Sequence, residues 1–212
     1  MLIYAVADIH GKERRFAKIE RQLVVYKPDV MVIAGDLSNY TKPERALERL
    51  NALPLPVLVI RGNTDLKRVE QRFEAYPNLI PLHLKTVTIG KIPFLGLSGT
   101  IPVPFRSRIR FKESDLFNRA AALVTAHTVL VAHPPPYGFL DEVAGKIHAG
   151  SRKLYHLVVG RQPAFLLCGH IHERPGIVRI GRSLVVNCNV TRGRAGALIE
   201  IHPGQSRSVT LL

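Results

Sequence analysis

Leu166-Leu167-Cys168-Gly169-His170-Ile171-His172-Glu173 is an apolar run that stops at a glycine and then presents two histidines. The apolar residues predict a buried strand. Residues i and i+2 of an extended chain point to the same side, so His170 and His172 can face one small volume. Gly169 has no Cβ, which lets the backbone turn and approach a ligand closely. Because imidazoles are common metal ligands, the stretch is either part of a metal site or a pair of surface histidines in a loop.

Three apolar runs near the N-terminus end in the same way, with polar residues that can carry chemistry. Their apolar residues do not alternate with polar ones, which is typical of strands in a parallel sheet covered on both faces. In such sheets the functional groups gather at the carboxyl ends of the strands. The runs are residues 2–7, 30–34 and 57–60, and they are followed by Asp8-Ile9-His10-Gly11, Gly35-Asp36 and Arg61-Gly62-Asn63-Thr64-Asp65.

Helices are expected to follow these strands. The second helix begins at Pro43, which suits the first turn of a helix, and it points Leu47 and Leu50 toward the core. The third covers residues 66–75. The first ends before Pro28, and its apolar stripe consists of Phe16, Ile19, Leu23 and Tyr26.

The rest of the chain is richer in strands. Residues 79–89 and 92–97 are expected to pair through a turn at Gly90-Lys91, and residues 100–112 to be irregular. Ser114 and Ser151 resemble N-caps of helices that run to about residue 126 and through residue 158. We predict one α/β domain over residues 1–212, with two sheets. Its remaining strands are expected at residues 129–132, 166–168, 177–180, 184–187, 197–201 and 209–211, the last four forming an antiparallel meander in the second sheet.

Length and composition fit a globular protein. The 212 residues allow one fairly large domain with a full core, and 46% of them are hydrophobic. No apolar segment reaches the ~20 residues of a membrane span. No basic region precedes the N-terminal apolar run, so we expect a strand there rather than a signal peptide, and a cytoplasmic protein. Cys168 and Cys188 are too few for a disulfide framework and are expected to be buried.

The chain is strongly basic, with a formal net charge of +14. Such a charge attracts polyanions and speeds the encounter with anionic substrates. The basic residues are scattered, and the densest cluster alternates at every second position. Nucleic-acid binding is one interpretation of that cluster, and a solvated strand face or loop is the favoured one. It consists of Arg106, Arg108, Arg110 and Lys112.

Seven polar side chains at five expected strand ends form the candidate site. One tetrahedral zinc would need at most four protein ligands. The larger set, with a carboxylate able to bridge, suits two metal ions ~3.5–4 Å apart. Its mixture of nitrogen and oxygen donors favours Mn, with Fe, Zn, Ni or Co as alternatives, over Mg or Ca. The seven residues are Asp8, His10, Asp36, Asn63, His133, His170 and His172.

The charge of such a centre indicates its substrate. Two divalent cations and two carboxylates leave a net charge of about +2, which neutral Asn and His ligands do not reduce. The centre would hold a phosphate ester and activate a bridging hydroxide, since a metal can lower the pKa of bound water to ~7. The reaction implied is in-line hydrolysis of a phosphate ester.

These residues also carry a resemblance to a known family. In order along nearly the whole chain, they resemble the five motifs of the calcineurin-like metallophosphoesterases, and the compact size is similar to small prokaryotic and archaeal members. The resemblance implies a four-layer α-β-β-α sandwich of two mixed sheets flanked by helices. It also implies a bridging role for Asp36. The motifs are Asp8-Ile9-His10, Gly35-Asp36, Gly62-Asn63, His133 and Gly169-His170-Ile171-His172. The ligands it implies are Asp8, His10, Asp36 and His172 for one metal and Asp36, Asn63, His133 and His170 for the other.

Two positions depart from the family pattern. Many members carry a histidine directly after the Gly-Asn of the third motif, where it is thought to protonate the leaving group. An aspartate three residues beyond the bridging one orients that histidine. This chain has Thr64 and Asn39 instead. A hydroxyl is a poor general acid near neutrality, so a contribution of ~10²–10⁴-fold is missing or comes from another residue. We therefore expect a slow phosphodiesterase that prefers activated aryl esters, with its general acid unknown.

The remaining polar residues near the site allow more than one interpretation. Asn63, Thr64 and Arg61 are candidates for binding the substrate, although Arg61 could equally pair with a carboxylate at the sheet edge. Asp65 is expected to cap the helix that follows it. Asp141 and His148 come after the Pro134–Gly138 segment, which cannot be helix or central strand, and lie either at the mouth of the site or in a solvated loop.

The expected function is a dinuclear metal-dependent phosphodiesterase that acts on a small organophosphate or nucleotide ester. One alternative is a nuclease acting on DNA or RNA, motivated by the positive charge. Another is a catalytically weak metal-binding scaffold, although a scaffold has no need to keep all seven ligands. The expected partner is a phosphate-ester substrate, nucleic acid is not favoured, and no membrane is expected. The sequence leaves the oligomeric state open.

Overall fold

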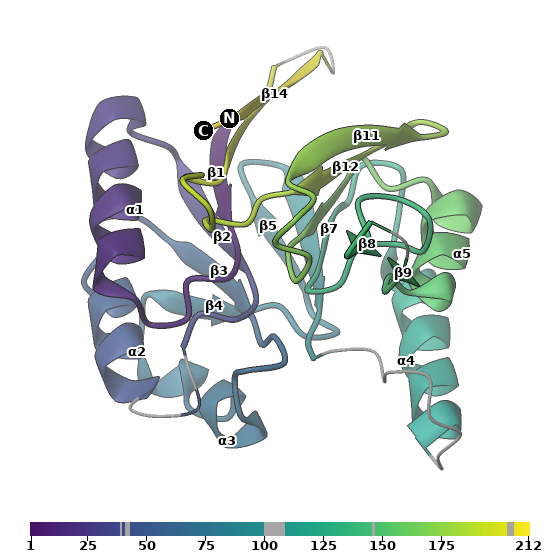
Figure 1. Ribbon diagram of the computed structural model, residues 1–212, viewed down its shortest axis with the longest axis horizontal. Coiled ribbons are helices and arrows are strands. Elements are labelled where there is room, and N and C mark those ends of the chain that lie inside the picture. The colour runs from purple at the N-terminus through teal and green to yellow at the C-terminus, as the bar shows by residue number, and fades with distance from the viewer. Residues whose placement is uncertain (39, 41–42, 100–108, 146, 203–205) are drawn as a thin grey trace.

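The computed structural model describes residues 1–38, 40, 43–99, 109–145, 147–202 and 206–212. Two six-stranded sheets pack face to face, and helices cover the outer face of each sheet (Figure 1). This arrangement confirms the four-layer α-β-β-α sandwich that the family resemblance implies. The N- and C-termini lie close together at one end of the first sheet.

The first sheet contains the strands whose ends carry Asp8, Asp36 and Asn63. Its strands are β1 (Leu2–Val6), β2 (Val30–Ala34), β3 (Val57–Ile60), β4 (Leu79–Pro81), β13 (Ala197–Ile201) and β14 (Arg207–Leu211). They are ordered β14-β13-β1-β2-β3-β4. Strands β1 to β4 run parallel, so the residues that follow β1, β2 and β3 emerge at one edge. Strands β13 and β14 are antiparallel additions beside β1.

The second sheet contains the strands whose ends carry the other histidines. Its strands are β5 (Thr86–Ile89), β6 (Ile92–Leu97), β7 (Val129–Ala132), β10 (Phe165–Cys168), β11 (Gly176–Ile180) and β12 (Ser183–Asn187). Their order is β11-β12-β10-β7-β6-β5, with four parallel strands in the centre and an antiparallel strand at each edge. A separate hairpin pairs β8 (Glu142–Val143) with β9 (Ile147–His148).

Helices form the two outer layers. They are α1 (Glu13–Tyr26), α2 (Pro43–Asn51), α3 (Lys67–Glu70), the 3-10 turn η1 (Phe73–Ala75), α4 (Ile109–Leu123) and α5 (Arg152–Arg161). In Figure 1, α1 and α2 cover the first sheet, and α4 and α5 cover the second. Helix α5 has the predicted N-cap, because the Ser151 hydroxyl accepts a hydrogen bond from the Leu154 amide at 3.0 Å.

The core explains why the strands do not alternate between apolar and polar residues. Val32 and Leu58 of the first sheet pack against Val131 and Leu167 of the second, between the sheets. Two further apolar clusters lie between each sheet and its helices. Central strands such as β2 therefore bury every side chain.

Two expectations about the sheets are wrong. Residues 79–89 are not one strand: β4 ends at Pro81 in the first sheet and β5 begins at Thr86 in the second, with Leu84 between them at a φ of +51°. The last two strands do not continue a meander in the second sheet, because β13 pairs with β1. Strand-forming patterns identify a strand but do not specify its partner, which tertiary packing decides.

Two helix predictions also need correction. Helix α4 begins at Ile109, five residues before Ser114 and inside the segment expected to be irregular, and it ends at Leu123. Arg110 and Lys112 of the basic cluster therefore lie in a helix and not in a strand, and Arg106 and Arg108 lie outside the described residues. Residues 66–75 form α3 and η1 rather than one helix.

The structure confirms the expected burial of both cysteines. Cys168 and Cys188 are free and fully or almost fully buried, as predicted. Within the described part of the chain, no helix is both long and apolar enough to cross a membrane.

Candidate metal centre

The candidate ligands lie on loops with an unusual backbone conformation. Asp8, His10, Asp36 and His170 have φ angles of +61°, +52°, +53° and +66°. A non-glycine residue in this left-handed region costs of order 1–3 kcal/mol, and it persists only where the surrounding structure imposes it. Four such residues at one edge of the fold indicate a functional site.

Backbone hydrogen bonds hold the loops after β1 and β2 together. The Asp8 amide donates to the Gly35 carbonyl (3.2 Å), the His10 amide to the Asp36 carbonyl (2.8 Å), and the Gly11 amide to the Leu37 carbonyl (3.0 Å). These bonds extend the pairing of the two strands beyond their ends. They place Asp8, His10 and Asp36 beside one another.

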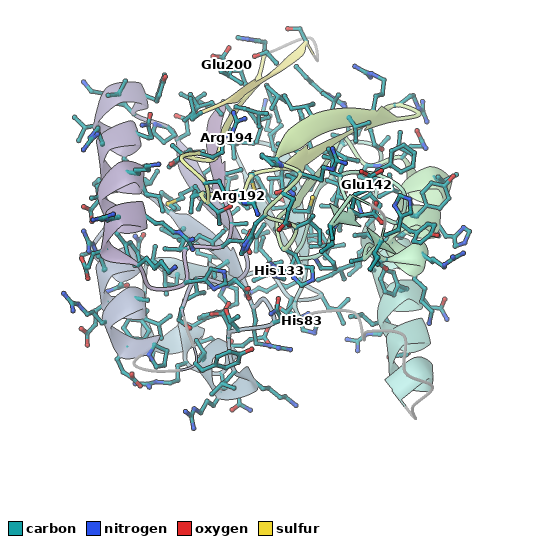
Figure 2. All side chains as sticks on the ribbon, viewed as in Figure 1. His83, His133, Glu142, Arg192, Arg194 and Glu200 are labelled. Carbon is teal, nitrogen blue, oxygen red and sulfur yellow. The ribbon has the colours of Figure 1, made fainter. Side chains whose placement is uncertain are left out.

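Contacts between the sheets bring the second sheet's histidines to the same place. His133 follows β7, and its Nδ1 donates to the Ala34 carbonyl at the end of β2 (2.8 Å), which puts the ring at the junction of the two sheets (Figure 2). The His170 amide donates to Asp8 Oδ2 (3.0 Å). A Cβ on Gly169 would lie 2.4 Å from Ala7 Cβ and 2.6 Å from Asp8 Oδ2, so only glycine fits there.

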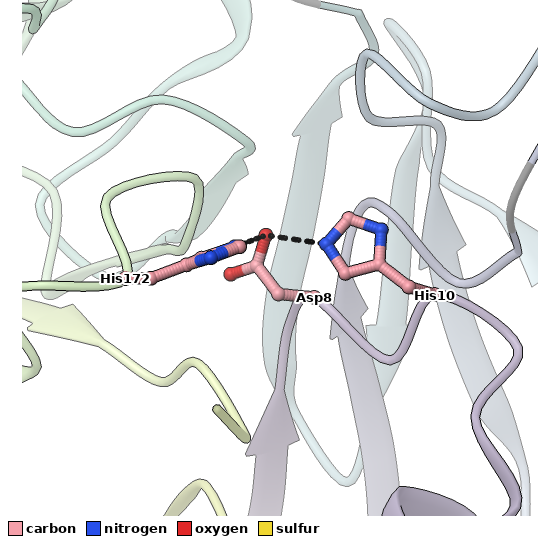
Figure 3. Close-up of side chains that lie close together, drawn as sticks. All are labelled: Asp8, His10 and His172. Atoms are coloured by element: carbon pink, nitrogen blue, oxygen red, sulfur yellow. Dashed lines mark ion pairs between the residues drawn. The ribbon is translucent and has the colours of Figure 1, made fainter. Parts of the chain in front are cut away.

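Three of the candidate ligands form the first group. His172 and His10 approach the Asp8 carboxylate from opposite sides (Figure 3). The distances to Asp8 Oδ1 are 3.2 Å from His172 Nε2 and 3.9 Å from His10 Nε2. The three side chains have the mutual spacing of residues that could hold one metal ion.

The second group lies on the other side of Asp36. His133 Nε2 is 3.4 Å from Asp36 Oδ2 and 2.9 Å from Asn63 Oδ1, and His170 Nδ1 is 3.0 Å from the same Asn63 oxygen. Asp36 Oδ2 is also 3.8 Å from His10 Nε2. Asp36 therefore lies between the two groups, and all seven residues selected from the sequence converge.

The electrostatics of the centre follow from its burial and its two carboxylates. Burial opposes a charge on His133, but its hydrogen bond to Asp36 and the charges of Asp36 and Asp8 raise its pKa to about 9. Burial also opposes a charge on Asp36, but His133 and the Thr64 amide lower its pKa to about 2. Burial and the neighbouring His133 lower the pKa of His170 to about 4. Without a metal ion, the centre therefore binds a proton on His133.

This proton predicts a pH dependence of the metal-free protein. Its free energy of unfolding should fall as the pH rises from about 6.5 to about 9, because folded His133 then loses a proton that the unfolded chain has already released. Chemical denaturation in the presence of a chelator would measure the decline. An Asp36→Asn variant removes the main partner of His133 and should decline less across this window; an equal decline in both proteins would contradict the assignment.

The atoms of the second group fit a metal ion better than they fit one another. His133 Nδ1 donates to a carbonyl, so in the neutral ring Nε2 offers a lone pair toward Asn63 Oδ1 and Asp36 Oδ2. The neutral ring thus places two acceptors, His133 Nε2 and Asp36 Oδ2, 3.4 Å from each other. A proton or a cation satisfies such a group, and its nitrogen and oxygen donors suit a divalent transition metal.

The centre is closed on one side and open on the other. Asp8, Asp36 and His133 are buried at its base. The His172 side chain is 36% exposed and that of His10 is 17% exposed. A solute can therefore approach the two groups from the side of these histidines.

Asp65 has a role that differs from the predicted helix cap. Leu66 is the N-cap residue of α3 and makes no side-chain cap, whereas the Asp65 carboxylate turns inward and is 1% exposed. It accepts hydrogen bonds from the amides of Leu37 (3.2 Å), Ser38 (2.9 Å) and Gly62 (3.0 Å) and from the Ser38 hydroxyl (2.8 Å). Asp65 thus joins the loop of Asp36 to the loop of Asn63. In the sequence, its place in the loop directly after a strand, like that of the candidate ligands, is the signal that could have indicated this role.

Replacing Asp65 by alanine should destabilise the protein by about 3 kcal/mol, because the change leaves several buried donors without a partner. For a chain of this size that corresponds to a fall of roughly 10 °C in Tm, which thermal unfolding would measure. Asp115 is a matched control, since its side chain is 70% exposed on α4. Asp115→Ala should change stability by less than about 0.5 kcal/mol. Equal Tm values for the two variants would rule out the joining role.

The half-buried Thr64 contacts residues of two neighbouring loops. Its hydroxyl donates to the Ser38 carbonyl (3.0 Å) and lies 3.3 Å from His10 Nδ1, while its amide donates to Asp36 Oδ1 (2.8 Å). Because the Thr64 hydroxyl donates its proton to the Ser38 carbonyl, the hydroxyl oxygen can accept a hydrogen bond from the Nδ1–H of His10. The free lone pair of His10 is then on Nε2, the atom that faces the two carboxylates.

The other residues singled out from the sequence have the following places. Arg61 pairs with the Glu70 carboxylate (Nε to Oε2, 3.4 Å), which is the pairing considered as the alternative to a substrate contact. Its Nη1 also lies 3.4 Å from the Gly62 carbonyl. Asp141 and His148 contact each other on the loop after His133. Asn39 lies outside the described residues.

Sequence comparison decides the family of this fold and site. A model of the family described as calcineurin-like phosphoesterase matches residues 1–174, which include all seven candidate ligands. The chain belongs to the calcineurin-like phosphoesterase family. This calcineurin-like phosphoesterase therefore falls in a metal-dependent class of phosphoric ester hydrolases, and it carries two groups of candidate metal-binding residues.

Individual relatives agree with this assignment. The calcineurin-like phosphoesterase is 29% identical to an uncharacterized protein of Methanocaldococcus jannaschii over 196 residues, which cover 88% of this chain and 87% of that protein. Its fold is similar to a dimetal phosphatase from Danio rerio (TM-score 0.67, 9% identity, 95% of this chain and 93% of the other). It is also similar to an archaeal phosphodiesterase (TM-score 0.58, 11% identity, all of both chains). At these identities the two structures support the fold alone.

Proposed function

We propose that this protein is a dinuclear metal-dependent phosphodiesterase that hydrolyses a small organophosphate or nucleotide ester. The observation that carries the proposal is the convergence of two carboxylates, one amide and four imidazoles in two adjacent groups, with the carboxylates of Asp8 and Asp36 between them. The fold that the chain shares with a dimetal phosphatase and an archaeal phosphodiesterase is consistent with it.

The proposed ligands divide between two divalent transition metals, with manganese preferred. Asp36 belongs to both sets. When bound, the metals would supply positive charge for the phosphoryl oxygens and activate the attacking water. The protein's own residues position these ions. The sets are Asp8, His10, Asp36 and His172 for one metal and Asp36, Asn63, His133 and His170 for the other.

The surroundings of the centre favour diesters with good leaving groups. Two divalent ions and two carboxylates leave a centre of about +2, which suits an anionic phosphoryl group. The Thr64 hydroxyl is hydrogen-bonded to Ser38 and is not presented to a leaving group. Asn63 belongs to the second group of candidate ligands. If it contacts the substrate, it does so at the phosphoryl group beside the metals and not at a separate binding site. Arg61 is held by Glu70 and contributes its charge from a distance.

A substrate panel would test the proposal. The protein would be reconstituted separately with Mn, Ni, Zn and Mg and assayed on nitrophenyl and alkyl phosphodiesters, phosphomonoesters and single-stranded DNA. We expect hydrolysis of bis-nitrophenyl phosphate with Mn, loss of that activity in His10→Ala, and no change in His127→Ala, whose residue is exposed and precedes β7, at the end of that strand opposite to His133. Inactivity on every ester with every metal would refute the proposal. Salt-sensitive cleavage of DNA would instead favour the nuclease.

Thr64→Val should weaken metal binding by roughly 10-fold or more, because removing a group that orients a metal-binding histidine typically costs 10–100-fold in affinity. The valine retains the amide that donates to Asp36 but loses the hydroxyl that faces His10. Thr64→Ser keeps the hydroxyl and serves as the control. Isothermal titration of the metal-free proteins with Mn would measure the difference, and equal affinities for the valine and serine variants would contradict the role.

A further inference from the structure

We propose that His148, held by Asp141, is the general acid that protonates the leaving group, in place of the histidine that this chain lacks at Thr64. The inference rests on the proposed phosphodiesterase function and adds to it a catalytic residue outside the metal centre. It explains how a site whose third motif carries a threonine could still expel a poor leaving group.

Asp141 is built to hold a histidine. Its side chain is buried, with 1% of the residue exposed, and Oδ2 accepts hydrogen bonds from the amides of Gly138 and Gly150, both at 3.0 Å. The other oxygen, Oδ1, lies 2.7 Å from His148 Nδ1. Gly150 is required there, because a Cβ would lie 2.8 Å from Asp141 Oδ2.

The geometry sets the state of the imidazole. Since the carboxylate can only accept, His148 Nδ1 carries a proton and Nε2 is at the outer end of the ring. The side chain is 38% exposed, so Nε2 can reach a solute, unlike the fully buried His133. An aspartate that fixes the tautomer and orientation of a histidine is the arrangement that general acid–base catalysis uses. Tyr137 flanks the ring at 5.3 Å between centroids, and the Arg152 guanidinium lies 4.1 Å from the centre of the Tyr137 ring.

The pair is attached at two points to loops that carry candidate ligands. The segment that contains it continues directly from His133 through Pro134, Pro135 and Pro136, and Ser151 holds it by hydrogen bonds to Pro135 and Tyr137. Strand β9, which contains His148, pairs with Glu142 of β8. Glu142 forms an ion pair with Arg174, two residues after His172 (Glu142 is labelled in Figure 2). These contacts connect the segment of His148 to the loops that carry His133 and His172.

As the oxygen of the attacking water bonds to phosphorus, the bond from phosphorus to the leaving oxygen breaks and its electron pair stays on that oxygen. The leaving oxygen takes the Nε2 proton of protonated His148 and departs as an alcohol. His148 is then neutral, with the proton on Nδ1 hydrogen-bonded to Asp141 Oδ1, and Nε2 regains a proton from solvent. The protons of the attacking water pass to solvent.

Leaving-group dependence would test the proposal with the metal-loaded enzyme. A series of phosphodiesters that share one ester group and differ in the second would run from nitrophenyl through phenyl to alkyl. His148→Gln should lower kcat/KM by about 10²-fold or more for the alkyl ester and by less than about 10-fold for the nitrophenyl ester. His127→Gln, an exposed histidine on another loop, is the matched control and should leave the whole series unchanged. A merely structural role of His148 would lower all members of the series equally.

A second measurement does not depend on activity. Long-range ¹H–¹⁵N spectra of the metal-free protein should find neutral His148 with its proton on Nδ1, and Asp141→Asn should weaken that preference. An active wild type with equal losses across the series in His148→Gln, or with no loss, overturns the general acid but leaves the proposed function intact. A wild type inactive on every ester overturns both.

Discussion

Asp36→Asn is expected to lose hydrolysis of phosphodiesters almost completely and to bind divalent metal far more weakly. Asp36 Oδ2 lies 3.4 Å from His133 Nε2 and 3.8 Å from His10 Nε2, so this carboxylate, like that of Asp8, is close to histidines of both groups. Asparagine keeps the shape and can still accept from the Thr64 amide, but it removes the charge. Removing one partner from a buried charged set costs ~3–5 kcal/mol. That corresponds to roughly 10²–10⁴-fold in affinity for the metal that depends on it.

Calorimetric titration with Mn and assays on bis-nitrophenyl phosphate would measure these losses. Asp115→Asn carries the same chemical change at an exposed position on α4 and should behave as the wild type in both. The metal-free Asp36→Asn protein should remain folded, because asparagine can still accept the hydrogen bond from the Thr64 amide. Without the charge of Asp36, the buried His133 ring no longer binds its proton so strongly, and the neutral ring is the form that burial favours. An Asp36→Asn protein with wild-type metal affinity would remove Asp36 from the centre.

The sequence predicts the candidate site better than it predicts the sheet that each strand joins. Ligand positions could be read because each follows a short apolar run, and the ends of parallel strands meet at one edge. Strands β2, β3 and β7 have the predicted bounds, since uninterrupted apolar runs between polar residues leave little choice. Strand β13 was assigned to the wrong sheet because its apolar pattern fits any half-buried position.

The contacts among the polar side chains could not be read in the same way. Asp65 stands directly before a helix, and local sequence therefore favours an N-cap, but its carboxylate reaches the amides of Leu37 and Ser38 only after two loops meet. Thr64 likewise marks the absence of a histidine in the sequence, whereas in the fold its hydroxyl faces His10. Both roles depend on tertiary neighbours about 26 to 54 residues away in the chain.

Gly62→Ala is expected to disrupt the centre although it replaces none of the candidate ligands. A Cβ at this position would lie 2.1 Å from Asp36 Oδ1 and 2.4 Å from the Asp36 backbone nitrogen, far inside contact distance. Because one of these atoms is backbone, a side-chain rotation cannot relieve the clash, and either the Asp36 loop or the Asn63 loop must move. Overpacking of this kind costs ~1–3 kcal/mol, and we expect the upper end of that range together with at least a 10-fold loss of metal affinity.

Gly160→Ala provides the matched control for that prediction. Gly160 lies within α5, and no described atom lies within 4 Å of the Cβ that alanine would add. Since alanine favours a helix over glycine, this variant should be neutral or more stable by up to ~1 kcal/mol, with unchanged metal affinity. Thermal unfolding and titration with Mn would compare the two proteins. If Gly62→Ala matched Gly160→Ala in both, the close approach of the Asn63 loop to Asp36 would not be needed to assemble the centre.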